Sequence, residues 1–135
     1  NFWRMEELGI DKHPNLQLVE FDLTDLSTCI RLLQSTGATE IYNLAGFATG
    51  ARMSEDAVGI GDTNGLSVVR LLEAMRLHAP AARLVQASSR EVFGAAAVSP
   101  QDEETPRRPR NAYGAAKAYA DDVRAGTFPG PEHTF

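Results

Sequence analysis

The sequence contains one cysteine, no long run of apolar residues and no excess of positive charge. A single thiol, Cys29, cannot form an intramolecular disulfide, so a disulfide-stabilised fold is excluded and a reducing compartment such as the cytoplasm is expected. No apolar stretch approaches the roughly 18 to 20 residues of a membrane span, so we expect no membrane as partner. Thirteen Lys and Arg residues against eighteen Asp and Glu give a net charge of -5, and this balance does not favour binding to nucleic acid.

The sequence also lacks an initiator methionine and a signal-peptide pattern at its start, so we expect an internal piece of a longer chain. Its 135 residues, 43% hydrophobic and 23% charged, are typical of one small globular domain. The histidines lie far apart, which predicts no metal site; they are His13, His78 and His133.

Short apolar runs alternate with segments of helical periodicity. The runs predict strands over residues 16–22, 40–45 and 83–87. Helices are expected from Asp25 or Thr24 to Gly37, over residues 62–78, and over residues 112–125 with Asn111 as the cap. In the second helix the apolar face is expected to consist of Leu66, Val69, Leu72 and Met75. Residues 46–59 are expected to form a loop, and residues 126–135 an irregular tail.

This order of elements predicts an α/β fold with a doubly wound parallel sheet. Ligands of such sheets bind beyond the carboxyl ends of the strands. The functional residues are therefore expected just after Asp22, Leu44 and Ala87.

Tyr113 and Lys117 are four residues apart in the last predicted helix, so they lie on one helical face. A neighbouring cation favours the phenolate form of tyrosine, as a tyrosine acid/base near neutral pH requires. The alternative is an ordinary pair of exposed helix residues.

The segment Gln86 to Gly94 leaves the last predicted strand with two hydroxyls, Ser88 and Ser89, and a carboxylate, Glu91. These groups can hydrogen-bond a substrate alcohol and accept a proton from carbon. The alternatives are turn chemistry for the serines and a solvated charge for Glu91.

Together the motifs resemble the extended short-chain dehydrogenase/reductase superfamily, and within it the GDP-mannose 4,6-dehydratases most closely. Residues 86–94 match that family's Gln-Ala-Ser-Thr-Ser-Glu segment, and residues 109–117 match its Pro-Arg-Ser-Pro-Tyr-Gly-x-Ala-Lys segment. Residues 21–25, 39–45, 71–74 and 101–106 also match. The resemblance implies that residues 1–125 are the central part of a dinucleotide-binding Rossmann domain, and that residues 126–135 are a tail or discontinuous segment.

The resemblance implies a redox-neutral dehydration of GDP-mannose to GDP-4-keto-6-deoxymannose, with NADP as cofactor and NAD as the second possibility. Tyr113 would take the C4 hydroxyl proton, Ser89 would hydrogen-bond the C4 oxygen, and Glu91 would remove the C5 proton. Lys117 would bind the nicotinamide ribose. The resemblance implies that Tyr113 also contacts the cofactor. The remaining cofactor-binding residues that it implies are Asp22, Leu23, Leu44, Ala45 and Gly46. A GDP-sugar is the expected substrate, and a dimer or tetramer of the chain is the expected assembly.

The sequence departs from the family pattern at Phe47, Ala48 and Arg90, and at Arg107 and Arg108. The family's Gly-rich β-α unit and its substrate lobe are missing, and residues 59–65 imitate a Gly-rich turn without the required spacing or a preceding strand. Two alternatives therefore stay open: a sugar-nucleotide 4-epimerase or 4-keto reductase, and a degenerate homologue without catalytic activity.

Overall fold

The structure is a computed structural model and describes residues 2–47 and 56–127. Two of its elements form a small sheet, and helices account for the others. In chain order the elements are α1 (Trp3–Glu7), α2 (Leu26–Thr36), β1 (Glu40–Asn43), α3 (Ala57–Gly61), η2 (Asp62–Leu66), α4 (Ser67–His78), β2 (Arg83–Gln86), η3 (Arg90–Val92) and α5 (Ala112–Ala125).

β1 and β2 pair in parallel, with Glu40 opposite Arg83 and Asn43 opposite Gln86. Because the strands are parallel, the chain must cross back between them, and it does so through the helices α3, η2 and α4. Both strands therefore end at the same edge of the sheet. The expected α/β class with a parallel sheet is confirmed.

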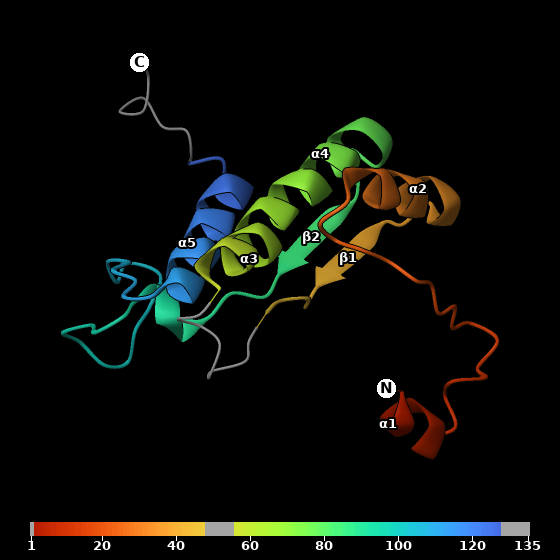
Figure 1. Cartoon of the computed structure of the whole chain (residues 1–135), viewed down its shortest axis with the longest axis horizontal. Helices are drawn as coiled ribbons and strands as arrows, with labels where there is room; N and C mark the ends of the chain where they lie inside the picture. The colour runs from red at the N-terminus through yellow and green to blue at the C-terminus, as the bar shows by residue number, and fades with distance from the viewer. Residues whose placement is uncertain (1, 48–55, 128–135) are drawn as a thin grey trace.

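The helices α3, η2 and α4 follow one another without a break and lie between α2 on one side and α5 on the other (Figure 1). Apolar side chains of α2 and α4 form the main core against the sheet. Its buried members are Leu23, Cys29, Leu33, Leu71, Ala74 and Met75. Burial raises the pKa of the Cys29 thiol, so this cysteine is a core residue and not a reactive one.

The expected ends of α2 and α5 are confirmed. The Asp25 side chain accepts a hydrogen bond from the Ser27 amide at 2.8 Å, and Gly37 ends the helix with φ 58°. At α5, Asn111 accepts a hydrogen bond from the Gly114 amide at 2.7 Å. Between the two proposed caps of α2, the structure selects Asp25 over Thr24.

The predicted strand over residues 16–22 is wrong. This segment has no strand geometry, and it runs outside the packed helices between α1 and α2 (Figure 1). Its apolar side chains are exposed; Leu18 and Val19 have exposed fractions of 48% and 50%. A strand needs a hydrogen-bonded neighbour, and within the described residues this segment has none.

The predicted start and apolar face of the middle helix also need correction. The helical segment begins at Ala57, where Asp56 accepts a hydrogen bond from the Gly59 amide, so the predicted loop is shorter; residues 48–55 of that loop lie outside the described residues. Residues 59–65, expected to imitate a Gly-rich turn without being one, lie within the helical elements α3 and η2. The buried face of α4 consists of Ser67, Val68, Leu71, Ala74 and Met75. Of the four residues predicted to form it, only Met75 is buried, and Leu66 is 47% exposed.

No helix within residues 2–47 and 56–127 is long and apolar enough to span a bilayer. The same residues contain no group of three or more His, Cys, Asp or Glu side chains that could bind a metal ion. Ala48, His133 and the predicted tail from residue 128 lie outside the described part of the chain.

Candidate functional site

The candidate tyrosine and lysine lie on the first two turns of α5. The Lys117 ammonium is 6.0 Å from the centre of the Tyr113 ring. Asn111 caps the helix two residues before Tyr113, so a purely local interaction fixes where the helix begins. The spacing of four residues then places both side chains on one face.

Lys117 is 3% exposed and reaches the end of β2, where its Nζ donates a hydrogen bond to the Ala87 carbonyl at 3.0 Å. Burial lowers the pKa of Lys117 below its ordinary value of 10.5, and the negative charge of Asp121 opposes that shift. An exposed helix pair would show neither the burial nor the contact with β2. The structure therefore contradicts that alternative for Lys117.

Glu91 lies in the short helix η3, which packs against α5, and Ser89 caps that helix at its start. The Ser89 Oγ accepts a hydrogen bond from the Glu91 amide at 3.2 Å, so part of its role is the turn chemistry named above. The Glu91 carboxylate accepts a hydrogen bond from Asn111 Nδ2 at 3.0 Å. Through this one amide side chain, the start of α5 and the carboxylate are held together.

Gly46 follows β1 and passes close to Lys117. A Cβ atom at Gly46 would lie 2.9 Å from Asn64 Oδ1 and 3.3 Å from Lys117 Nζ, so a larger residue would displace these side chains. Asn64, in the π-helical segment η2, is 1% exposed and bonds both backbone groups of Phe47: its Oδ1 accepts from the amide at 2.8 Å, and its Nδ2 donates to the carbonyl at 3.2 Å. This amide fixes the course of the chain after β1.

Leu23, Leu44 and Ala45 line one cavity of about 500 Å³ beside β1. Leu23 is buried in the core, whereas Leu44 is 76% exposed. Asp22 precedes Leu23 on the surface, and hydrogen bonds from the Thr24 hydroxyl and amide lower the pKa of its carboxyl below 3.8. Of the residues predicted to bind the cofactor, Leu23, Leu44 and Ala45 thus line this cavity, with Asp22 next to Leu23 in the chain. Gly46 lies beside Lys117, and Lys117 beside Tyr113.

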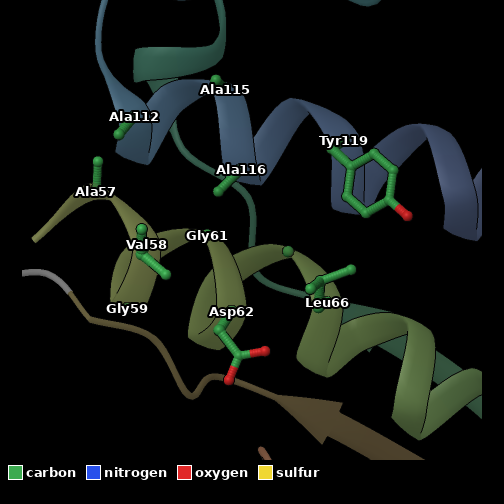
Figure 2. Close-up of a pocket in the computed structure, with 11 residues that line it drawn as sticks. Ala57, Val58, Gly59, Gly61, Asp62, Leu66, Ala112, Ala115, Ala116 and Tyr119 are labelled. Carbon is green, nitrogen blue, oxygen red and sulfur yellow. The ribbon is translucent and has the colours of Figure 1, made fainter.

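A second cavity, of about 660 Å³, lies between two groups of elements: α3 and η2 on one side, and a different face of α5 on the other (Figure 2). Small side chains of α5, among them Ala112 and Ala116, face Val58 and Leu66 across it. None of the predicted site residues lines this second cavity. It is therefore separate from the candidate site.

Sequence reasoning missed three contributors to the site. Asn64 lay in a predicted helix without a role, Asn111 was expected only as a cap, and Asp121 was not singled out. A polar residue such as Asn64 among apolar helix positions is a weak signal of a buried partner. The sequence carries no signal for which partner each of them contacts.

A sequence model of the GDP-mannose 4,6 dehydratase family matches residues 1–125. The chain therefore belongs to the GDP-mannose 4,6-dehydratase family. It is 37% identical over 125 residues to the GDP-mannose 4,6-dehydratase of Yersinia enterocolitica, an alignment that covers 89% of this chain and 34% of that protein. This member of the family thus spans about a third of the length of that curated relative.

Solved structures of similar fold include short-chain dehydrogenase/reductase enzymes that act on sugar nucleotides. The dTDP-glucose 4,6-dehydratase of Bacillus anthracis, in complex with NAD, is 26% identical with a TM-score of 0.78, over 98% of this chain and 39% of that one. RMD from Pseudomonas aeruginosa, complexed with NADPH, shares the fold with a TM-score of 0.71 at 23% identity, over 95% of this chain and 46% of that one. The Rossmann-type fold expected of a GDP-mannose 4,6-dehydratase family member is confirmed.

Proposed function

We propose that the protein carrying this chain converts GDP-mannose to GDP-4-keto-6-deoxymannose. One observation carries the proposal: the buried ammonium of Lys117 lies between the Tyr113 ring and the strand end that leads to Ser89 and Glu91. A base, a hydrogen-bond donor and a carboxylate thus come from neighbouring elements. Family membership and the relative in Yersinia enterocolitica support the choice of substrate.

Tyr113 acts as the base for the C4 hydroxyl. Its phenolic oxygen takes the hydroxyl proton, and the ammonium of Lys117, 6.0 Å from the centre of the ring, places a positive charge beside it. Ser89 donates a hydrogen bond to the C4 oxygen as it becomes a ketone. The nicotinamide cofactor, when bound, supplies the hydride acceptor for C4 and the hydride donor for C6.

Glu91 acts in the elimination. Its carboxylate removes the C5 proton, which the adjacent C4 ketone has made acidic, and the resulting carboxylic acid protonates the departing C6 hydroxyl, which leaves as water. The hydrogen bond from Asn111 orients this carboxylate toward the start of α5. Arg90, one position earlier, is exposed, and the ion pairs of the described residues do not include it.

The residues around the loop after β1 suit a nicotinamide cofactor. Gly46 leaves the space beside Lys117 that a Cβ atom would fill, and Lys117 brings a cation there. Leu23, Leu44 and Ala45, which line the cavity beside β1, would bind the remainder of the cofactor together with Asp22. We propose NADP, and titration calorimetry with NADP and with NAD tests the preference. The homo-oligomer stays a prediction.

The decisive variant is Glu91→Gln in the complete protein. It removes the base but keeps the hydrogen-bonding shape, so release of the 4-keto-6-deoxy product is expected to fall about 10²- to 10⁴-fold. Glu104→Gln, at an exposed loop position, is the matched control and should leave the rate unchanged.

Unchanged loss of water in Glu91→Gln would refute the dehydratase assignment. A product that is epimerised at C4 and retains its C6 hydroxyl would favour the epimerase alternative. Absence of cofactor binding and of turnover in the unmodified protein would favour the degenerate homologue, an alternative motivated by the sequence departures at Phe47, Ala48 and Arg90.

A further inference from the structure

Two side chains of α5 contact consecutive residues after β2. Lys117 donates to the Ala87 carbonyl at 3.0 Å, and the Ser88 hydroxyl donates to Asp121 Oδ2. Lys117 and Asp121 are four residues apart, so they lie on the same helical face as Tyr113. The helix that presents the tyrosine thus also fixes the strand end from which Ser89 and Glu91 follow.

The environment of Asp121 differs from that of the next residue. Asp121 is 8% exposed, whereas Asp122 is less buried and pairs with Arg107 near the surface. Burying a carboxylate is costly unless hydrogen bonds and an opposite charge compensate it. At Asp121 the compensation comes from the Ser88 hydroxyl and from Lys117, one helical turn away.

We propose that Asp121 is a positioning residue: it anchors Ser88 and supplies the counter-charge of Lys117, so that the Ser89–Glu91 segment stays aligned with Tyr113. This inference rests on the proposed function of Tyr113 and Lys117. Asp121 touches no reacting atom in this scheme and acts through Ser88 and Lys117.

Because Asp121 provides the counter-charge of Lys117, its role should be visible in the pH at which Lys117 titrates. Burial lowers the pKa of Lys117, and the Asp121 charge raises it, so removing that charge lowers the pKa further. Tyr113 is the other titratable group beside Lys117 on α5. From the adjoining elements, η2 brings the neutral amide of Asn64 near Lys117, while the Glu91 carboxylate of η3 is hydrogen-bonded to Asn111 instead; Asp121 is the charge that acts on the pKa of Lys117.

The first measurement does not depend on turnover. In the complete protein labelled with ¹³Cε-lysine, the Lys117 signal, assigned with Lys117→Arg, is titrated by NMR. Asp121→Asn is expected to move its midpoint to lower pH, whereas Asp122→Asn, which removes an equal charge from the neighbouring position, should leave it in place. An unchanged midpoint in Asp121→Asn would overturn the inference, whatever the protein turns over.

The second measurement is the pH profile of kcat/KM with GDP-mannose. Asp121→Asn is expected to shift the alkaline limb to lower pH, and Ser88→Ala to lower kcat about tenfold or more without shifting that limb, since misplacement of reacting groups lowers rates steeply. If Ser88→Ala kept the kcat of the unmodified protein, the proposed role of the Ser88–Asp121 hydrogen bond would be refuted, even if Asp121→Asn failed to fold. Absence of turnover in the unmodified protein would refute the proposed function but not the NMR result.

Discussion

Gly114 lies at a close approach between α5 and η3, and replacing it with alanine should impair activity more than stability. A Cβ atom there would lie 2.4 Å from the Glu91 carbonyl oxygen and 3.0 Å from the Glu91 carbonyl carbon. Ordinary contacts of a Cβ atom begin at 3.4 Å. Because the opposing atoms belong to the backbone, α5 must move by about 1 Å relative to η3.

Two opposing effects determine how Gly114→Ala changes the free energy of unfolding. Alanine favours the helix by about 1 kcal/mol relative to glycine, while overpacking costs roughly 1 to 3 kcal/mol. The net loss is therefore about 0 to 2 kcal/mol. The same displacement separates Tyr113 from Glu91, and a misplacement of about 1 Å lowers catalytic rates roughly 10²-fold.

Gly61→Ala is the matched control for this experiment. Gly61 has helical backbone angles (φ -60°, ψ -44°), and a Cβ atom there would meet no atom within 4 Å. Its replacement should stabilise the protein by roughly 0.5 to 1 kcal/mol. Denaturant unfolding and kcat/KM with GDP-mannose are measured for both variants. If Gly114→Ala were as active as the parent and as stabilised as Gly61→Ala, the close contact of α5 with η3 would be refuted.

Two further predictions concern Asp25 and Asn64. Hydrogen bonds from the Ser27 hydroxyl and amide lower the pKa of Asp25 below 3.8, so its stabilisation is present above that value and is lost as the pH falls through the lower folded-state value. Unfolding midpoints of the parent should therefore exceed those of Asp25→Asn most at neutral pH and converge below pH 3.8; a constant difference would contradict this. Asn64→Leu removes both partners of the Phe47 backbone and should cost about 1 to 3 kcal/mol in denaturant unfolding. Parent-like stability would show that these hydrogen bonds contribute little.

Local signals predicted the helix ends well. Asp25 and Asn111 each bond an amide two or three residues away, and Gly37 ends its helix through its own backbone angle, so a short window of sequence contains the whole interaction. Residues 16–22 show the opposite case. Their apolar pattern is that of a strand, but pairing depends on a neighbour that the pattern does not specify.

The early start of the helical segment depended on packing. Gly59, Gly61 and Gly65 disfavour a helix by propensity. In the folded chain Gly65 allows a close approach to α5, since a Cβ atom there would lie 3.3 Å from the Tyr119 ring. Contact with α5 along α3 and η2 stabilises a helix that the residues alone do not favour.

The sequence by itself determined the α/β class, the face shared by Tyr113 and Lys117, and the motifs that identify the family. Each of these depends on spacing along the chain, which helical and strand periodicity convert directly into geometry. Only the tertiary structure decided that Lys117 is buried against Ala87, that Asn64 fixes Phe47, that Asn111 orients Glu91, and that Asp121 anchors Ser88. Each of these four contacts joins residues at least 17 positions apart, and packing of the helices against the sheet, not local periodicity, brings such partners together.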